Sequence, residues 1–155
     1  MDIPLKVKVS KQLQSISGFK LVRFQDKFLY NPDLHWYVLI RVPQEPCFLV
    51  VIITSEIDKR IAYYRNTKKQ KAVQCLIKID NNIFPFLTKP CVIECNKTEY
   101  LKIEEIIHKI DEEKGFTFRN ESVPTYLRQE IVSAIIYSPL ISRFIGNKAR
   151  SANPV

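Results

Sequence analysis

The sequence predicts one α+β domain, mainly β, in which strands come first and helices last. A chain of 155 residues fits a single domain, which we place at 1–155 with 1–20 as a possible N-terminal extension. The first half is rich in β-branched and aromatic runs, and the second half carries apolar residues at helical spacing. We therefore expect a small barrel or strongly bent sheet of about five to seven strands, followed by two or three helices.

The best-defined strands are residues 36–42 and 48–54, which are dominated by β-branched and aromatic side chains. The connection between them, 43–47, contains two prolines, so the pair is expected to form an antiparallel hairpin. Segment 5–9 alternates apolar and charged residues, which is the period of a strand with one wet face. Further strands are predicted at 20–24, 28–30, 72–79 and 91–95.

The second half predicts helices. Apolar residues from 101 to 110 recur at helical spacing, with Thr98 as a plausible N-cap and Gly115 as a plausible stop. A second helix is expected to start at Ser122, with Pro124 in its first turn, and to end at residues 138–139. A last short helix is predicted to end at Gly146.

Composition restricts the class of protein. Hydrophobic residues make up 46% and charged residues 26%, which are ordinary values for a globular protein and exclude wholesale disorder. We expect no membrane span and no secretory signal, because no apolar run is long enough for either. Four cysteines in a chain of this size favour reduced thiols in the cytoplasm over a disulfide framework.

The net charge of +8 is unevenly distributed. The first 78 residues hold 14 Lys and Arg against 6 Asp and Glu, whereas the remaining residues hold 10 of each. A surplus confined to one half favours a surface that faces a polyanion. The alternative is a solvated basic face without a ligand.

Segment 59–71 is the strongest candidate for nucleic-acid contact. It has six cations, no acid and two adjacent tyrosines, and it is expected to form a long loop or a short surface helix. Its cations can neutralise phosphates and its tyrosines can stack on unpaired bases. The residues predicted to bind RNA are Lys59, Arg60, Tyr63, Tyr64, Arg65, Lys68 and Lys69. The alternative is a solvated loop whose tyrosines cover the expected barrel.

Candidate catalytic residues lie at the ends of the predicted hairpin. His35 precedes the first strand, and a histidine there can transfer protons near neutral pH. Thr54 and Ser55 end the second strand, where hydroxyls can hydrogen-bond a phosphate or simply cap the next segment. Cys91 and Cys95 have poor zinc spacing and are better explained as core thiols, so neither a metal nor a cofactor is expected.

The order of these elements resembles the MazF/PemK-like toxins. The resemblance covers roughly residues 20–140 and rests on short motifs: H-W-Y-V-L-I, V-V-I-I-T-S, L-I-K-I, F-L-T-K-P-C-V-I, K-T-E-Y-L and a helix ending in A-I-x-x-S. It implies an SH3-like barrel, usually a homodimer, that cuts single-stranded RNA without a metal, leaves a 2′,3′-cyclic phosphate and is inhibited by an antitoxin protein. Thr54 matches the family's threonine, whereas His35 stands where the family has Arg, and the usual Gly-rich loop is absent.

We therefore predict a cytoplasmic endoribonuclease toxin. His35 would act as general base or acid, Thr54 and Ser55 would orient the phosphate, and Arg41 or Arg65 would stabilise the developing charge. The alternative is a catalytically inactive barrel that acts as an RNA-binding or protein-interaction module.

Overall fold

A computed structural model describes residues 3–29 and 33–152 of the chain. In this part, seven strands form one antiparallel sheet in the order β4-β5-β3-β2-β1-β7, and β6 pairs with β3. The strands are β1 (Phe19–Gln25), β2 (Leu34–Arg41), β3 (Cys47–Thr54), β4 (Leu76–Ile79), β5 (Cys91–Glu94), β6 (Glu99–Lys102) and β7 (Phe116–Phe118). The sheet is open, because no pairing among the described residues joins β4 to β7.

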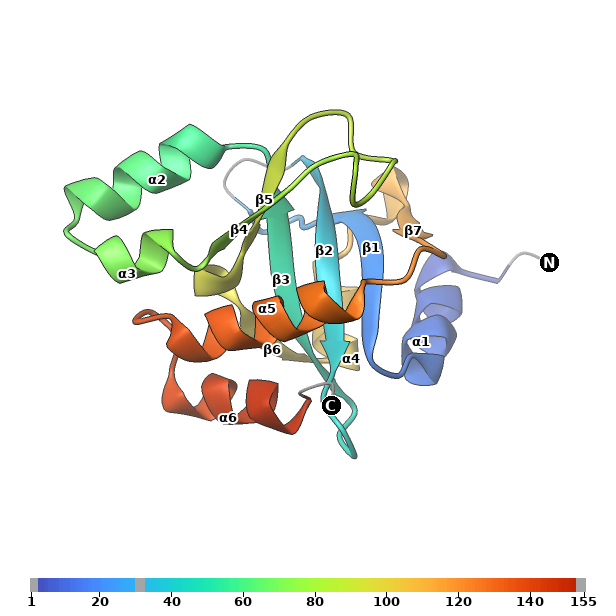
Figure 1. Ribbon diagram of the computed structural model, residues 1–155. Coiled ribbons are helices and arrows are strands. Elements are labelled where there is room, and N and C mark those ends of the chain that lie inside the picture. The colour runs from blue at the N-terminus through green and yellow to red at the C-terminus, as the bar shows by residue number, and fades with distance from the viewer. Residues whose placement is uncertain (1–2, 30–32, 153–155) are drawn as a thin grey trace.

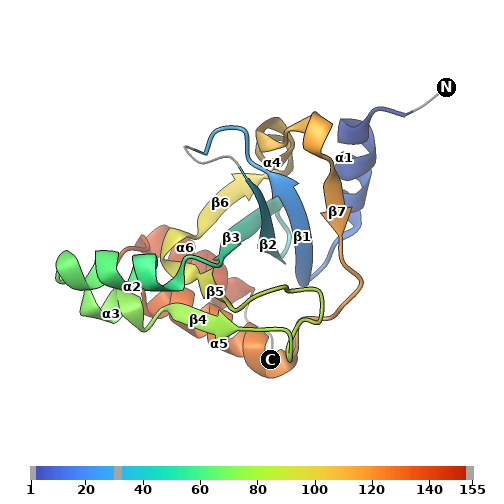
Figure 2. The ribbon, with the colours of Figure 1, turned by 90° about the horizontal axis from the view of Figure 1, so that it is seen from above.

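Helices cover both faces of the sheet. Figures 1 and 2 show α1 and α4 on one face, α5 and α6 on the other, and α2 with α3 beyond one edge. The helices are α1 (Leu5–Ser15), α2 (Ile57–Asn66), α3 (Gln70–Val73), α4 (Ile103–Lys109), α5 (Thr125–Tyr137), α6 (Arg143–Ser151) and the 3-10 turns η1 (Cys95–Lys97) and η2 (Glu112–Lys114). The predicted mixture of antiparallel strands and helices is confirmed, and the described chain has more helices than the expected two or three.

Strand alternation divides the interior into two cores. Along β2, Val38 and Ile40 face the core under α5, whereas Tyr37 and Leu39 face the core under α1 and α4. Successive side chains of a strand point to opposite faces of the sheet, so the long apolar runs of β2 and β3 supply both cores. All four cysteines are buried free thiols, as expected for core residues.

The predicted hairpin is confirmed. β2 and β3 pair antiparallel, with Trp36 opposite Ile53 and Arg41 opposite Phe48. The turn is closed by a 3.0 Å hydrogen bond from the Val42 amide to the Cys47 carbonyl.

The N-terminal strand prediction at 5–9 is wrong, because these residues begin helix α1. Val9 and Leu13 are one helical turn apart, and both are buried in the core shared with α4. Val7, which would share a strand face with Val9, is 44% exposed. Burial of one helical stripe against α4 therefore decides the conformation of this segment.

Other boundaries also differ from the prediction. Phe28 and Leu29 lie in a turn, and Tyr30 lies outside the described residues. Residues 72–75 belong to α3 and the turn after it, so the strand predicted from 72 starts only at Leu76. The helix predicted from Thr98 begins only at Ile103, because residues 99–102 pair with β3 as β6. Strand β7 was not predicted.

The last helix also differs, because α6 begins only at Arg143 and continues past Gly146 to Ser151. In the described ranges, no helix has both the length and the apolar character needed to cross a bilayer.

Candidate functional site

A cavity of about 440 Å³ opens at the end of the sheet where β2 begins and β3 ends. It is bounded by the β1–β2 connection, the first turns of α2, η1 and the start of β6. Its lining consists of Asp26, Leu29, Asp33, His35, Tyr37, Val50, Ile52, Thr54, Glu56, Lys59, Arg60, Tyr63, Lys97 and Glu99. Five residues that were predicted as functional therefore lie around one space: His35, Thr54, Lys59, Arg60 and Tyr63.

The hairpin register brings His35 and Thr54 together. The last pair of the β2–β3 ladder is Trp36 opposite Ile53; His35 and Thr54 come next on their strands, and both line the cavity. Thr54 is buried, and its Oγ1 accepts a 3.2 Å hydrogen bond from the Glu56 amide just before α2. Thr54 thus closes a short turn before α2, a helix that has no side-chain cap. A hydroxyl that accepts in this way keeps its own proton for donation to a ligand.

His35 is biased toward its neutral form. Burial lowers the pKa of His35, an effect that the nearby positive charge of Arg60 reinforces. The carboxylates of Asp33, Glu56 and Asp26 act in the opposite direction but do not reverse the shift. A neutral imidazole at physiological pH can accept a proton, which is the requirement for a general base.

Cations line the side of the cavity formed by α2 and η1. Lys59 and Arg60 project from the first turn of α2, and Lys97 ends η1. The Arg60 Nε atom is buried and has no hydrogen-bond partner among the described residues. Burial and the charge of Arg60 lower the pKa of Lys97, although Glu94 and Glu56 oppose this shift. A lysine with a lowered pKa gives up its proton more readily, as a general acid must.

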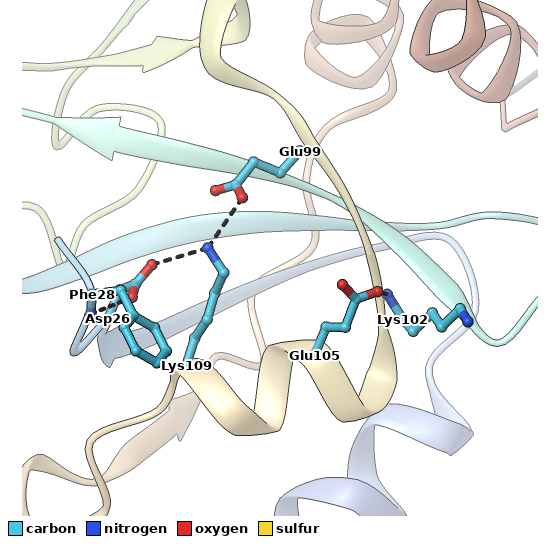
Figure 3. Close-up of polar contacts among 6 residues, drawn as sticks. All are labelled: Asp26, Phe28, Glu99, Lys102, Glu105 and Lys109. Carbon is cyan, nitrogen blue, oxygen red and sulfur yellow. Dashed lines mark hydrogen bonds and ion pairs between the residues drawn. The ribbon is translucent and has the colours of Figure 1, made fainter.

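Carboxylates also line the cavity. Figure 3 shows the Lys109 ammonium of α4 between two carboxylates, with its Nζ 3.4 Å from Asp26 Oδ2 and 3.1 Å from Glu99 Oε2. The Phe28 amide donates a 2.9 Å hydrogen bond to Asp26 Oδ1, so both oxygens of this buried carboxylate are occupied. Burial opposes the charge of Lys109, but its two acidic partners raise its pKa overall. The cluster therefore fixes Asp26 and Glu99 beside the cavity.

Tyr37 lies on the cavity floor. It is only 5% exposed, and its hydroxyl has no hydrogen-bond partner among the described residues. Burial, with the charges of Asp26 and Glu99, raises the pKa of Tyr37. The phenol thus remains protonated at neutral pH and can donate a hydrogen bond to a bound molecule.

Tyr64 does not reach the cavity. Its side chain is buried under α2, where its hydroxyl donates a 2.8 Å hydrogen bond to the carboxylate of Glu94. Asn96 donates to the same carboxylate through its backbone amide and its side chain. The stacking role predicted for Tyr64 therefore gives way to a structural one, in which the tyrosine anchors α2 to the sheet.

Arg41 lies away from the cavity, at the other end of β2 from His35. Its guanidinium donates to the backbone carbonyls of Glu45 at 2.9 Å, Leu13 at 3.2 Å and Ile16 at 3.4 Å. The side chain thus ties the end of α1 to the hairpin. The structure does not bring Arg41 to the predicted phosphate site.

The remaining predicted residues lie outside the cavity lining. Ser55 is exposed in the bend between β3 and α2. Arg65 is exposed in the last turn of α2, and Lys68 and Lys69 follow it in the connection to α3. These three cations lie close together in the chain, at and after the C-terminal end of α2.

Tyr37, Asp26, Lys97 and Glu99 are among the cavity residues that were not predicted. Tyr37 follows His35 at the strand period of two, so alternation along β2 was a signal for it. Asp26, Lys97 and Glu99 reach the cavity through contacts between segments that are far apart in the sequence. No local sequence pattern predicts that these three residues lie in a cavity.

In the part of the chain that the structure describes, no cluster of three or more His, Cys, Asp or Glu side chains has the arrangement of a metal site. No family model, no curated protein and no solved structure matches this chain.

Proposed function

We propose that the cavity is the active site of an endoribonuclease that cuts single-stranded RNA by attack of a 2′-hydroxyl on the adjacent phosphate. The observation that carries the proposal is that one cavity is lined by a histidine held toward its neutral form, an arginine whose buried Nε has no partner among the described residues, and a lysine with a lowered pKa. These groups match the three needs of the reaction, which are a base, charge stabilisation and an acid.

The proposed step is a phosphoryl transfer within the RNA strand. His35 accepts the proton of the 2′-hydroxyl as the O2′–phosphorus bond forms. The bond between phosphorus and O5′ breaks, and Lys97 donates a proton to the leaving O5′. Arg60 and the Thr54 hydroxyl stabilise the charge on the phosphate oxygens. The products are a 2′,3′-cyclic phosphate and a free 5′-hydroxyl, and the step requires no metal.

The resemblance to MazF/PemK-like toxins extends this proposal. It suggests that the protein is a cytoplasmic homodimer with an SH3-like core, inhibited by an antitoxin protein. The sheet of the described residues is open and does not close into a barrel, so this part of the proposal rests on the order of the elements along the chain. The exposed cations Lys59, Arg65 and Lys68, together with Tyr63 and the half-buried Lys69, would hold the flanking RNA.

A second candidate is a binding module without catalysis. The cavity lining holds four carboxylates, from Asp26, Asp33, Glu56 and Glu99, against the cations Lys59, Arg60 and Lys97. This balance attracts a polyanion less strongly than the net charge of the chain suggests. In this reading the basic surface outside the cavity binds RNA or an acidic protein, and the cavity has no chemical role.

A cleavage assay in EDTA tests the first candidate against the second. We expect the purified protein to cut a long single-stranded RNA into discrete fragments that end in cyclic phosphate. Arg60→Gln should reduce kcat, whereas Arg65→Gln, a matched change at the exposed end of the same helix, should only raise KM. Intact RNA combined with salt-sensitive RNA binding would overturn the nuclease and favour the binding module.

A further inference from the structure

Tyr37 and Lys97 both line the cavity, but different charges act on them. Arg60, Glu56 and Glu94 act on the pKa of Lys97, and Asp26 and Glu99 act on that of Tyr37. The proposed function assigns Arg60 and Lys97 to the phosphate and the leaving group, and it gives Tyr37, Asp26 and Glu99 no role. A nucleotide extends from its phosphate to its base, so the residues around Tyr37 are candidates for contact with the base.

The unpaired hydroxyl of Tyr37 indicates that a ligand binds beside Asp26 and Glu99. A buried hydroxyl without a partner is costly, and the described residues leave this one unpaired at the cavity floor. Because burial raises its pKa, the phenol is a hydrogen-bond donor at neutral pH. It is suited to a ligand carbonyl oxygen.

Glu99 supplies the neighbouring acceptor. Asp26 already uses both of its oxygens, on the Phe28 amide and on Lys109. The Glu99 side chain is half-exposed, and Lys109 contacts only its Oε2. Figure 3 shows Lys109 between the two acids, so the ion pair holds the Glu99 carboxylate in place without using its second oxygen. A carboxylate has two lone pairs on each oxygen, so the free Oε1 and the remaining lone pair of Oε2 can together accept from two adjacent N–H donors.

We infer that the side of the cavity formed by Tyr37 and Glu99 is a base subsite selective for guanine. The Tyr37 hydroxyl donates to guanine O6, and the Glu99 carboxylate accepts from N1–H and from the exocyclic amine. Val50 and Ile52 of the cavity floor offer an apolar surface to the ring. The inference rests on the proposed function for the position of the phosphate. It predicts that the enzyme cuts RNA next to guanine nucleotides.

Other bases fit this pair of groups less well. Hypoxanthine keeps O6 and N1–H but lacks the exocyclic amine. Adenine presents its N1 acceptor toward the carboxylate, and uracil has one N–H between two carbonyl oxygens. A site built to pair two N–H groups discriminates against a ligand that lacks one of them, because an acceptor is then left unsatisfied.

Binding of 3′-mononucleotides tests the inference independently of catalysis. Titration calorimetry with 3′-GMP and 3′-IMP should give a Kd for GMP roughly tenfold lower than that for IMP, with AMP and UMP weaker still. Glu99→Gln should abolish the difference between GMP and IMP, which a merely structural role of Glu99 would not do. Tyr37→Phe should weaken GMP and IMP to the same extent, because both carry O6. The control Glu104→Gln changes an exposed residue of α4 and should leave all constants unchanged.

The outcomes separate this inference from the proposed function. Equal affinity for GMP and IMP, or no binding of any mononucleotide at millimolar concentration, would overturn the guanine subsite. RNA cleavage without preference for guanine would overturn it too, while sustaining the nuclease. Selective binding of GMP by a protein that leaves RNA intact would support the subsite and overturn the nuclease.

Discussion

Tyr64 and Glu94 are 30 residues apart in the sequence, and a 2.8 Å hydrogen bond joins them in the protein interior. Arg60 lies one helical turn before Tyr64 on α2, and it reaches the cavity. The bond that anchors the helix to β5 therefore also determines where the Arg60 guanidinium lies. The two adjacent tyrosines therefore have different roles: Tyr63 lines the cavity, and Tyr64 holds the helix in place.

Tyr64→Phe should lower the free energy of unfolding by about 2 kcal/mol, because it removes a donor from a buried carboxylate. Tyr63→Phe is the matched control, since Tyr63 is 54% exposed and its substitution should change stability little. Urea titrations of the two variants measure the difference. Equal stabilities would show that the bond to Glu94 does not anchor α2.

Val9→Ala should destabilise the protein by about 2 kcal/mol, and Val7→Ala should have little effect. Val9 is 1% exposed and Val7 is 44% exposed, because the two lie on different sides of α1. Thermal unfolding of the two variants measures the contrast. Equal losses would contradict the helix and favour a strand, in which positions 7 and 9 share a face.

Sequence reasoning succeeded where local signals agreed. β2 and β3 combine β-branched side chains with a proline-containing turn, so their conformation and pairing could be predicted, with boundaries within two residues of those observed. Sequence reasoning failed where a contact with a distant segment determines the secondary structure. The Lys–Val alternation of residues 5–9 fits a strand locally, but burial of Val9 and Leu13 against α4 selects a helix. Likewise, β6 is a strand only because it pairs with β3.

Arg41→Met should lower the free energy of unfolding by about 1–2 kcal/mol, because three backbone carbonyls lose their donor. Below the melting temperature, RNA cleavage should keep its wild-type rate, since Arg41 lies outside the cavity lining. Chemical denaturation and initial cleavage rates test the two statements. A stable variant that has lost cleavage would restore the catalytic role predicted for Arg41.

Stability should decline as the pH falls below about 6.5, the ordinary pKa of histidine. Burial lowers the pKa of His35 in the folded protein, so the unfolded chain binds the proton more tightly. The loss begins near the unfolded pKa and is complete below the folded one. In urea titrations at pH 7.5 and 5.5, His35→Asn should reduce the decline, and His108→Asn, at an exposed position on α4, should retain it. The same decline in wild type and His35→Asn would contradict the assigned shift.

The candidate site was only partly predictable. His35 and Thr54 end strands of one hairpin, so register alone brings them together. The position of Arg60 depends on α2, whose anchor is Glu94 on a separate strand. Lys109 forms ion pairs with both Asp26 and Glu99, and no spacing in the sequence predicts that cluster. Residues that are brought together from distant segments cannot be identified from the sequence and are found only in the folded structure.

The most direct test of the central claim is the initial rate of RNA cleavage by three proteins: wild type, His35→Ala and His108→Ala. The substrate is a long single-stranded RNA in EDTA, and circular dichroism confirms that each variant is folded. We predict cyclic-phosphate fragments from wild type and His108→Ala, and a rate at least about 100-fold lower for His35→Ala. Cleavage by His35→Ala at the wild-type rate, or intact RNA with the wild-type protein, would contradict the account.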